Sequence, residues 1–151
     1  MSQRLSITET APEVYEGLLA ADQAVRGGPL GATVRELVKI RASQLNGCAY
    51  CVDLHVREAL KLGESQDRLF QLPVWRESPL FTGAERAALG YTDAATLLGP
   101  DGVSDEVWRE AASQFKPDEL GALVGQVALI NAFNRIGVPL QMQPRIRTPR
   151  K

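Results

Sequence analysis

The sequence predicts an all-α protein of about six to eight helices, folded as one domain over residues 1–151. Three observations support this fold class. Helix-starting and helix-ending signals recur along the chain, apolar residues between them return every three or four positions, and no segment alternates like a half-buried strand. No internal repeat or long linker divides the chain, which is long enough to bury a core of its own.

The first half of the chain contains four helical segments. Thr10-Ala-Pro12-Glu13 has the pattern of a capping box and precedes an apolar series that Gly27-Gly28-Pro29 ends. Asn46-Gly47 breaks the second segment, and Gly63 is a natural C-terminal cap for the third. We therefore expect helices from the Thr10 cap to residue 26, then over about 32–45, 48–62 and 65–72.

The second half contains three more segments. Thr82-Gly-Ala-Glu85 repeats the capping-box pattern, and Lys116-Pro117-Asp118-Glu119 starts the last helix, which stops at Gly137. This last helix is apolar over most of its circumference, so it is buried in the core or against a second subunit. We expect helices over about 82–98, 104–108 and 117–137.

Composition excludes several classes of function. The formal net charge is −1, and the only basic cluster is the tail at Arg145, Arg147, Arg150 and Lys151, so no nucleic-acid surface is expected. No apolar run approaches the ~18 residues of a membrane span. The N-terminus lacks the apolar stretch of a signal peptide, which predicts a cytoplasmic protein.

The two cysteines of the chain lie three residues apart, which in a reducing compartment indicates redox or metal chemistry rather than a structural disulfide. On a helix, Cys48, Cys51 and His55 face the same way, so the imidazole can exchange a proton with a sulfur. The Asn46-Gly47 break also places both cysteines at the start of a helix, where free N–H groups and the macrodipole favour thiolate. A second cysteine one turn away can capture a sulfenic acid as a disulfide.

Glu36, eleven intervening residues, and Cys48-x-x-Cys51-x-x-x-His55 together resemble the core motif of the alkylhydroperoxidase AhpD-like family, in the carboxymuconolactone decarboxylase superfamily. The resemblance extends over most of the chain, including residues 7–18, 36–62 and 75–86. Decarboxylases of the superfamily lack the cysteine pair, so its presence argues against lactone decarboxylation.

The resemblance implies a role for each residue of the motif. Cys51 is similar to the cysteine that attacks peroxide and becomes a sulfenic acid, and Cys48 to the resolving cysteine that closes the disulfide. His55 and Glu36 are similar to the relay that removes the proton from the attacking thiol. Some members carry a second histidine just before the second cysteine, where this chain has Tyr50.

The resemblance also implies the partners. The substrate is hydrogen peroxide or an organic hydroperoxide, and the reductant is a dithiol protein that bears a lipoyl group or resembles thioredoxin. Relatives assemble as trimers, dimers or hexamers, so a homo-oligomer is expected. No cofactor is expected, because no Gly-x-Gly-x-x-Gly follows a strand.

Other interpretations stay open at this point. The same motif could bind zinc through Cys48, Cys51 and His55, although ligands along one helical stripe spread over about 10 Å. It could also serve a non-catalytic redox sensor. Glu36 could merely cap a helix, since Thr33-Val-Arg-Glu36 is itself a capping box. Further open roles concern Tyr50, which we expect to pack rather than line a pocket, and the polar residues of the last helix, Asn131, Asn134 and Arg135.

Overall fold

A computed structural model describes residues 2–145, and these residues form helices and no β-sheet. The helices are α1 (Ile7–Thr10), α2 (Pro12–Arg26), α3 (Ala32–Leu45), α4 (Ala49–Lys61), α5 (Gln66–Gln71), the 3-10 helix η1 (Leu72–Val74), α6 (Gly83–Thr96), α7 (Asp105–Gln114) and α8 (Pro117–Gly137). The predicted all-α fold is therefore confirmed. Residues 147, 150 and 151 of the basic tail lie outside the described part.

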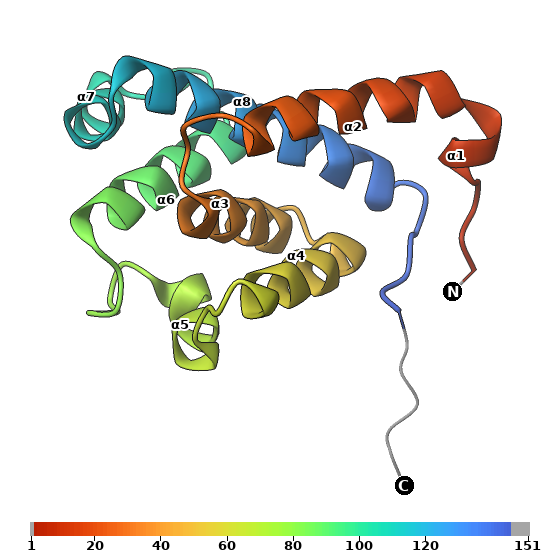
Figure 1. Cartoon of the computed structure of the whole chain (residues 1–151), viewed down its shortest axis with the longest axis horizontal. Helices are drawn as coiled ribbons and strands as arrows, with labels where there is room; N and C mark the ends of the chain where they lie inside the picture. The colour runs from red at the N-terminus through yellow and green to blue at the C-terminus, as the bar shows by residue number, and fades with distance from the viewer. Residues whose placement is uncertain (1, 146–151) are drawn as a thin grey trace, which may run out of the picture.

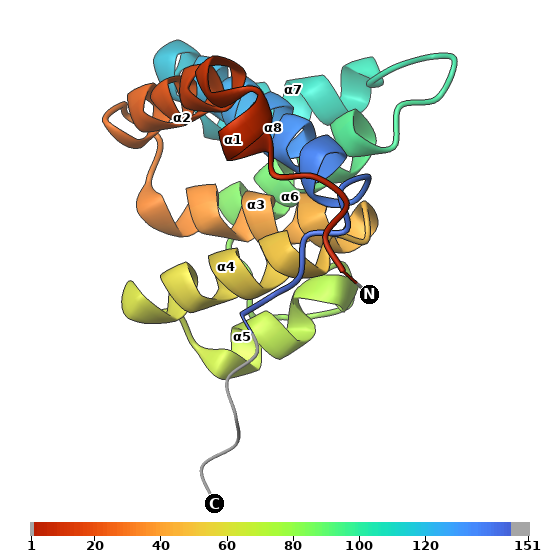
Figure 2. The same ribbon diagram turned by 90° about the vertical axis from the view of Figure 1, so that its right-hand side faces the viewer.

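Helix α3 lies at the centre of the molecule, packed against α4, α6 and α8 (Figure 1). Helices α2 and α8 pack together above it, while α4 and α5 lie below (Figure 2). The segment after α8 returns beside the N-terminus, where the Arg4 N–H donates to the carbonyl of Leu140 at 2.9 Å. The central helix can therefore place side chains between α4 on one side and α8 on the other.

Two apolar clusters surround α3 and fix its neighbours. One joins α3 to α6, α7 and α8 and includes Val38, Leu123 and Val127, and the other joins it to α4, α5 and α6 and includes Leu37 and Ile40. All five residues are at most 2% exposed. Full burial of such side chains contributes about 1.5–3 kcal/mol each, so α3 is held from two sides.

Capping residues explain the starts of α6 and α7. Thr82 accepts the Glu85 N–H, and the Glu85 carboxylate accepts the Thr82 N–H, which confirms the predicted capping box. Ser104 accepts the Val107 N–H at the start of α7. Each cap satisfies backbone donors that the first helical turn leaves without a partner.

Two predictions about the helices were wrong. Thr10 does not cap α2, because its hydroxyl bonds the carbonyl of Ser6 inside a short helix α1 that the sequence analysis missed. Helix α7 runs to Gln114, well past the expected end at Trp108, because buried Ala111 holds its second half against the core. Helix α4 starts at Ala49 with Cys48 as its cap, in agreement with the start expected at about residue 48.

Helices α8 and α2 differ in burial. Helix α8 buries residues along its whole length against α2, α3 and α6, so its apolar surface is used largely within the chain. Helix α2 has no buried residue, although it lies along α8. Among the described residues, no helix is long and apolar enough to cross a membrane.

Candidate active site

The two cysteines lie where α3 gives way to α4. Helix α3 ends at Asn46, Gly47 turns the chain with a φ of +67°, and Cys48 caps α4 by accepting the Cys51 N–H at 3.3 Å. Cys48 and Cys51 form a disulfide with their Cα atoms 5.3 Å apart, close to the expected reach. Both residues are nearly fully buried. The sulfurs are thus held at a helix N-terminus, a position that stabilises thiolate.

Glu36 on α3 faces His55 on α4. Its Oε2 lies 3.2 Å from His55 Nδ1, and its Oε1 accepts a hydrogen bond from Lys39 Nζ at 3.0 Å. Burial alone would raise the pKa of Glu36, but the hydrogen bonds and charges of His55 and Lys39 outweigh it and hold this pKa below the usual value of 4.5. Because a carboxylate only accepts, His55 donates from Nδ1, and Nε2 is the ring atom that can take a proton.

The capping interpretation of Glu36 is excluded by this geometry. Helix α3 begins after Gly31, with no side-chain cap, so Glu36 lies beyond the first turn. Both of its oxygens bond side chains, not the backbone.

Lys39, which the sequence motif does not include, is 1% exposed and extends the polar chain beyond Glu36. Its Nζ lies 4.0 Å from Asp22 Oδ1 on α2, and the same oxygen accepts a hydrogen bond from Gln126 on α8 at 3.1 Å. The spacing of Lys39 one turn after Glu36 was a usable signal. No sequence signal pointed to Asp22 or Gln126, because α2 and α8 are distant in the chain.

A cavity of about 350 Å³ opens beside this polar chain, and we name it the Cys51 cavity. Cys51 and His55 line it together, and Tyr15 and Tyr50 are also among its lining residues. Tyr50 was expected to pack, so this placement corrects the prediction. Burial and the neighbouring Tyr50 raise the pKa of Tyr15, which keeps that phenol protonated as a donor. The remaining lining residues are Leu19, Asp22, Arg26, Lys39, Leu54, Glu58, Gln126, Ile130, Phe133, Ile136 and Met142.

Cys48 lines a different hollow, which we name the Cys48 groove. Its volume is about 560 Å³, and it lies along the end of α3, the turn at Gly47 and the start of α4. The other lining residues are Ser43, Gln44, Ala49, Val52, Asp53, Val56 and Pro144. The sequence predicted that Cys48, Cys51 and His55 face the same way. In the structure Cys51 and His55 line one hollow and Cys48 lines another, so the prediction was wrong for Cys48.

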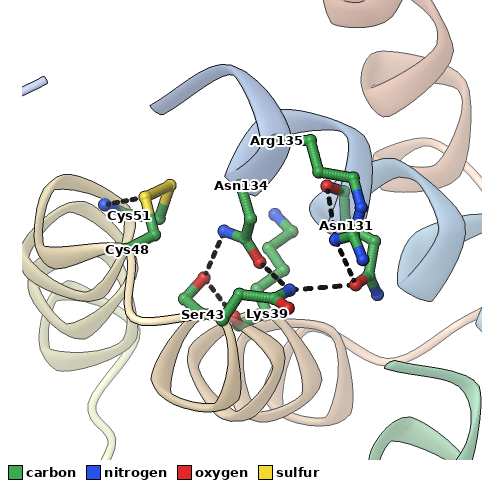
Figure 3. The surroundings of a disulfide bond; sticks show 8 residues. Lys39, Ser43, Cys48, Cys51, Asn131, Asn134 and Arg135 are labelled. Carbon is green, nitrogen blue, oxygen red and sulfur yellow. Dashed lines mark hydrogen bonds between the residues drawn. A yellow bond between two sulfur atoms is a disulfide. The ribbon is translucent and has the colours of Figure 1, made fainter. Parts of the chain in front are cut away.

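The polar residues of α8 hold the cysteine turn in place (Figure 3). Asn134 accepts a hydrogen bond from the Asn46 side chain and donates one to Ser43 Oγ, at 2.9 and 3.0 Å. Asn131 also accepts from Asn46, at 2.9 Å, and Arg135 in turn donates to Asn131. Their role is to satisfy polar groups within the chain, which answers the question that the sequence left open.

Gly137, at the end of α8, packs directly on the disulfide. A Cβ atom at this position would lie 2.8 Å from Cys48 Sγ and 3.5 Å from Cys51 Sγ. Only a residue without a side chain allows α8 to approach the sulfurs this closely. The sequence alone predicts only that Gly137 ends the last helix.

The zinc interpretation finds no support in the part of the chain that the structure describes. Among these residues, no group of three or more His, Cys, Asp and Glu side chains could hold a metal ion. The cysteines are joined to each other, and Glu36 and His55 bond each other. The arrangement instead combines a sulfur pair that can be oxidised with a base oriented by a buried carboxylate.

Fold and site together define a helical protein with a Cys-x-x-Cys disulfide at a helix start, next to a glutamate–histidine pair. The chain belongs to the carboxymuconolactone decarboxylase family, whose model matches residues 12–94, and within it to the AhpD-like proteins. The resemblance inferred from the motif is thereby confirmed.

Relatives with similar sequences cover nearly the whole chain. The uncharacterized protein YdfG of Bacillus subtilis is 35% identical over 140 residues, which cover 93% of this chain and 95% of that protein. The crystal structure of ATU0492 from Agrobacterium tumefaciens, a protein of unknown function named as a putative antioxidant defence protein AhpD, is 34% identical, with a TM-score of 0.93. The match covers 97% of this chain and all of that chain. The debrominase Bmp8 shares the fold, with a TM-score of 0.81 at 16% identity over 91% of this chain and 74% of its own.

Proposed function

We propose that this protein is a thiol-dependent peroxidase that reduces hydrogen peroxide or an organic hydroperoxide. The observation that carries the proposal is that His55, hydrogen-bonded to the buried Glu36, lines one cavity together with Cys51, while the disulfide partner Cys48 lies one turn away. A nucleophile, a base and a group that orients the base are the parts that such a reaction needs.

In the first step, His55 takes the proton of the Cys51 thiol, and Glu36 stabilises the resulting imidazolium through Nδ1. The Cys51 thiolate then attacks the terminal oxygen of the hydroperoxide. The O–O bond breaks, Cys51 becomes a sulfenic acid, and the alkoxide leaves as an alcohol, or as water from hydrogen peroxide, after it takes a proton from His55.

In the second step, the Cys48 thiol releases its proton and its sulfur attacks the sulfur of the Cys51 sulfenic acid, which closes the disulfide. The hydroxide that is expelled takes up a proton and leaves as water. The Cys51 N–H that Cys48 Sγ accepts stabilises the attacking thiolate. A dithiol protein of lipoyl-bearing or thioredoxin-like chemistry then returns both cysteines to thiols. Such a cycle suits a reducing compartment such as the cytoplasm.

The walls of the Cys51 cavity accommodate a substrate with an apolar part. Leu19, Ile130 and Phe133 line it, and its volume of about 350 Å³ exceeds what hydrogen peroxide requires. An organic hydroperoxide could place its apolar body against these residues and its peroxide group at Cys51.

A steady-state peroxidase assay with single-cysteine variants tests the proposal. We expect Cys51→Ser to abolish turnover and sulfenic acid trapping together. We expect Cys48→Ser to stop turnover but leave a trappable sulfenic acid on Cys51, since attack survives and only resolution fails. The His55→Ala variant should attack slowly at neutral pH and recover in part as pH rises, because thiolate then forms without the base.

Two outcomes would overturn the assignment. A sulfenic acid on Cys48 in the Cys51→Ser variant, formed at the rate of the unmodified protein, would reverse the roles of the sulfurs. One stoichiometric oxidation without sustained turnover, for every dithiol tried, would indicate a redox sensor instead.

We also propose that the protein works as a homo-oligomer, either a dimer, a trimer or a hexamer. Helix α2, which forms one wall of the Cys51 cavity, has no buried residue in the single chain. A second subunit over α2 would bury its exposed apolar side chains and steady that wall.

A further inference from the structure

We propose that the dithiol reductant approaches through the Cys48 groove and attacks Cys48 Sγ, so that peroxide and reductant reach the disulfide from opposite faces of α4. This inference rests on the proposed peroxidase cycle and adds the route and the target atom of its reducing step. The occupant of the groove is an aliphatic dithiol, because the disulfide-bonded residue Cys48 lines the groove and Val52, Val56 and Pro144 supply apolar walls.

The two hollows share no residue, and α4 separates them. Tyr50, Cys51, Leu54, His55 and Glu58 of α4 line the Cys51 cavity, a set that follows one face of a helix. The residues of α4 on the Cys48 groove are Ala49, Val52, Asp53 and Val56, which follow the other face. A molecule in one hollow therefore does not occupy the other.

Access to Cys48 is restricted on its other side. Gly137 of α8 lies so close that even a Cβ there would be 2.8 Å from Cys48 Sγ. Helix α8 thus covers the sulfur, and the groove is the hollow that borders it. Gln44, which lines this groove, carries a buried side-chain oxygen without a hydrogen-bond partner, so a thiol or amide donor in the groove would find an acceptor.

The chemistry favours attack from the groove. Thiol–disulfide exchange is a displacement in which the attacking thiolate, the attacked sulfur and the leaving sulfur lie in line. A thiolate of the reductant that bonds Cys48 Sγ from the groove breaks the S–S bond and expels Cys51 as a thiolate on the side of His55. The proton that this reductant thiol has released to solvent restores the thiol of Cys51. The second thiol of the reductant then attacks the reductant's own sulfur in the mixed disulfide and expels Cys48 as a thiolate. The reductant leaves as a cyclic disulfide, and two electrons have passed to the protein.

Attack on Cys51 is the competing route. It would require the reductant to enter the Cys51 cavity, whose walls come from α2, α3, α4 and α8 and whose floor holds Lys39 and Gln126. That route would expel Cys48 towards Gly137 and away from the base. It would also make peroxide and reductant compete for one space.

Matched tryptophan substitutions on α4 separate the two routes. Ala49 and Leu54 are both exposed, and they line the groove and the cavity respectively. We expect Ala49→Trp to slow reduction of the disulfide by dihydrolipoamide at least tenfold and to leave oxidation of the dithiol form by cumene hydroperoxide within twofold. The Leu54→Trp variant should show the reverse pattern. Unchanged reduction in Ala49→Trp, or tenfold slower reduction in Leu54→Trp, would overturn the inference.

A mapping experiment identifies the attacked sulfur directly. The disulfide is formed with diamide, so the result does not depend on any peroxidase activity. The oxidised protein is then mixed with 2-mercaptoethanol, quenched within seconds by acid and iodoacetamide, and mapped by mass spectrometry. We expect the mercaptoethanol adduct on Cys48 and the alkyl label on Cys51, and the opposite labelling would contradict the inference even if peroxidase turnover is observed.

Discussion

At the scale of single residues, the buried carboxylate of Glu36 is the group on which the geometry of the site depends. It joins α3 to α4 through His55 and meets Lys39 on its own helix, and its side chain is 4% exposed. An ion pair this deeply buried contributes little net stability, but removal of one partner leaves the other charge uncompensated. The site is therefore sensitive to any change in the charge of Glu36.

We predict that Glu36→Gln lowers the free energy of unfolding by about 1–3 kcal/mol at pH 7, because Lys39 loses its charged acceptor. The pKa of Glu36 in the folded protein lies below the ordinary 4.5, so the stability that its charge contributes is complete above that value and is lost as pH falls through the folded pKa. The difference between the two proteins should therefore shrink below about pH 4.5. Urea unfolding between pH 3 and pH 7 measures it.

Glu77→Gln is the matched control, because Glu77 is exposed and lies in the segment before α6. This substitution should change stability by less than about 0.5 kcal/mol. A difference for Glu36→Gln that grows on acidification would contradict the assigned direction of the pKa shift.

A second prediction concerns Gly137. We expect Gly137→Ala to destabilise the protein by about 1–3 kcal/mol, because the new methyl group meets Cys48 Sγ and either α8 or the cysteine turn must move. Gly121→Ala in the same helix is the control, since its Cβ would meet nothing within 4 Å and a helical alanine gains up to about 1 kcal/mol over glycine. Thermal unfolding of both variants compares them, and equal stabilities would disprove the close-packing argument.

Residue by residue, the sequence predicted the members of the candidate site better than the residues that surround them. Glu36, Cys48, Cys51 and His55 were found because helical spacing and a familiar motif link them over twenty positions. Gly137 could not be found, since its closeness to the sulfurs depends on how α8 crosses α4. The split of the two sulfurs between separate hollows likewise follows from side-chain packing, which spacing alone does not determine.

At the scale of helices, capping patterns in the sequence predicted several helix boundaries. They failed where contacts with other parts of the chain determine where a helix begins or ends. The Thr82–Glu85 box is present as expected. The capping box predicted at Thr10 is absent, because the Thr10 hydroxyl donates to the backbone carbonyl of Ser6 at the start of α1. The polar residues of α8 show the same dependence, since their partners come from α3.

We predict that Asn134→Ala destabilises the protein by about 2 kcal/mol, because it removes the buried hydrogen bonds to Asn46 and Ser43. Loss of the Asn46 contact should also loosen the turn before Cys48, which hydrogen exchange at the amides of residues 46–48 would report. Arg135→Ala, one position along on an exposed surface, should cost less than about 0.5 kcal/mol. Equal costs for both variants would argue against a network that fixes the turn.

At the scale of the whole molecule, four helices line the Cys51 cavity, and they differ in how extensively the rest of the chain packs against them. Helices α3, α4 and α8 belong to the packed centre, whereas α2 contacts mainly α8 and leaves Val14 and Leu19 61% and 47% exposed. The sequence predicted an interface from the apolar surface of α8. In the structure the apolar surface of α8 is largely buried against other helices of the same chain. The exposed apolar side chains of α2 are therefore the better candidates for a contact with a second subunit.

The last prediction follows from this exposed helix. We expect light scattering at micromolar concentration to give a mass that is a multiple of 16.5 kDa. Val14→Asp should lower that mass, because a carboxylate on the outer face of α2 would be buried without a partner in the interface. Val74→Asp is the control, since Val74 is 54% exposed but lies on η1, beside α3 and α5 and away from α2. The mass of this variant should stay unchanged. A stable monomer for the unmodified protein would refute the oligomer, and dissociation by Val74→Asp alone would place the interface at η1 rather than at α2.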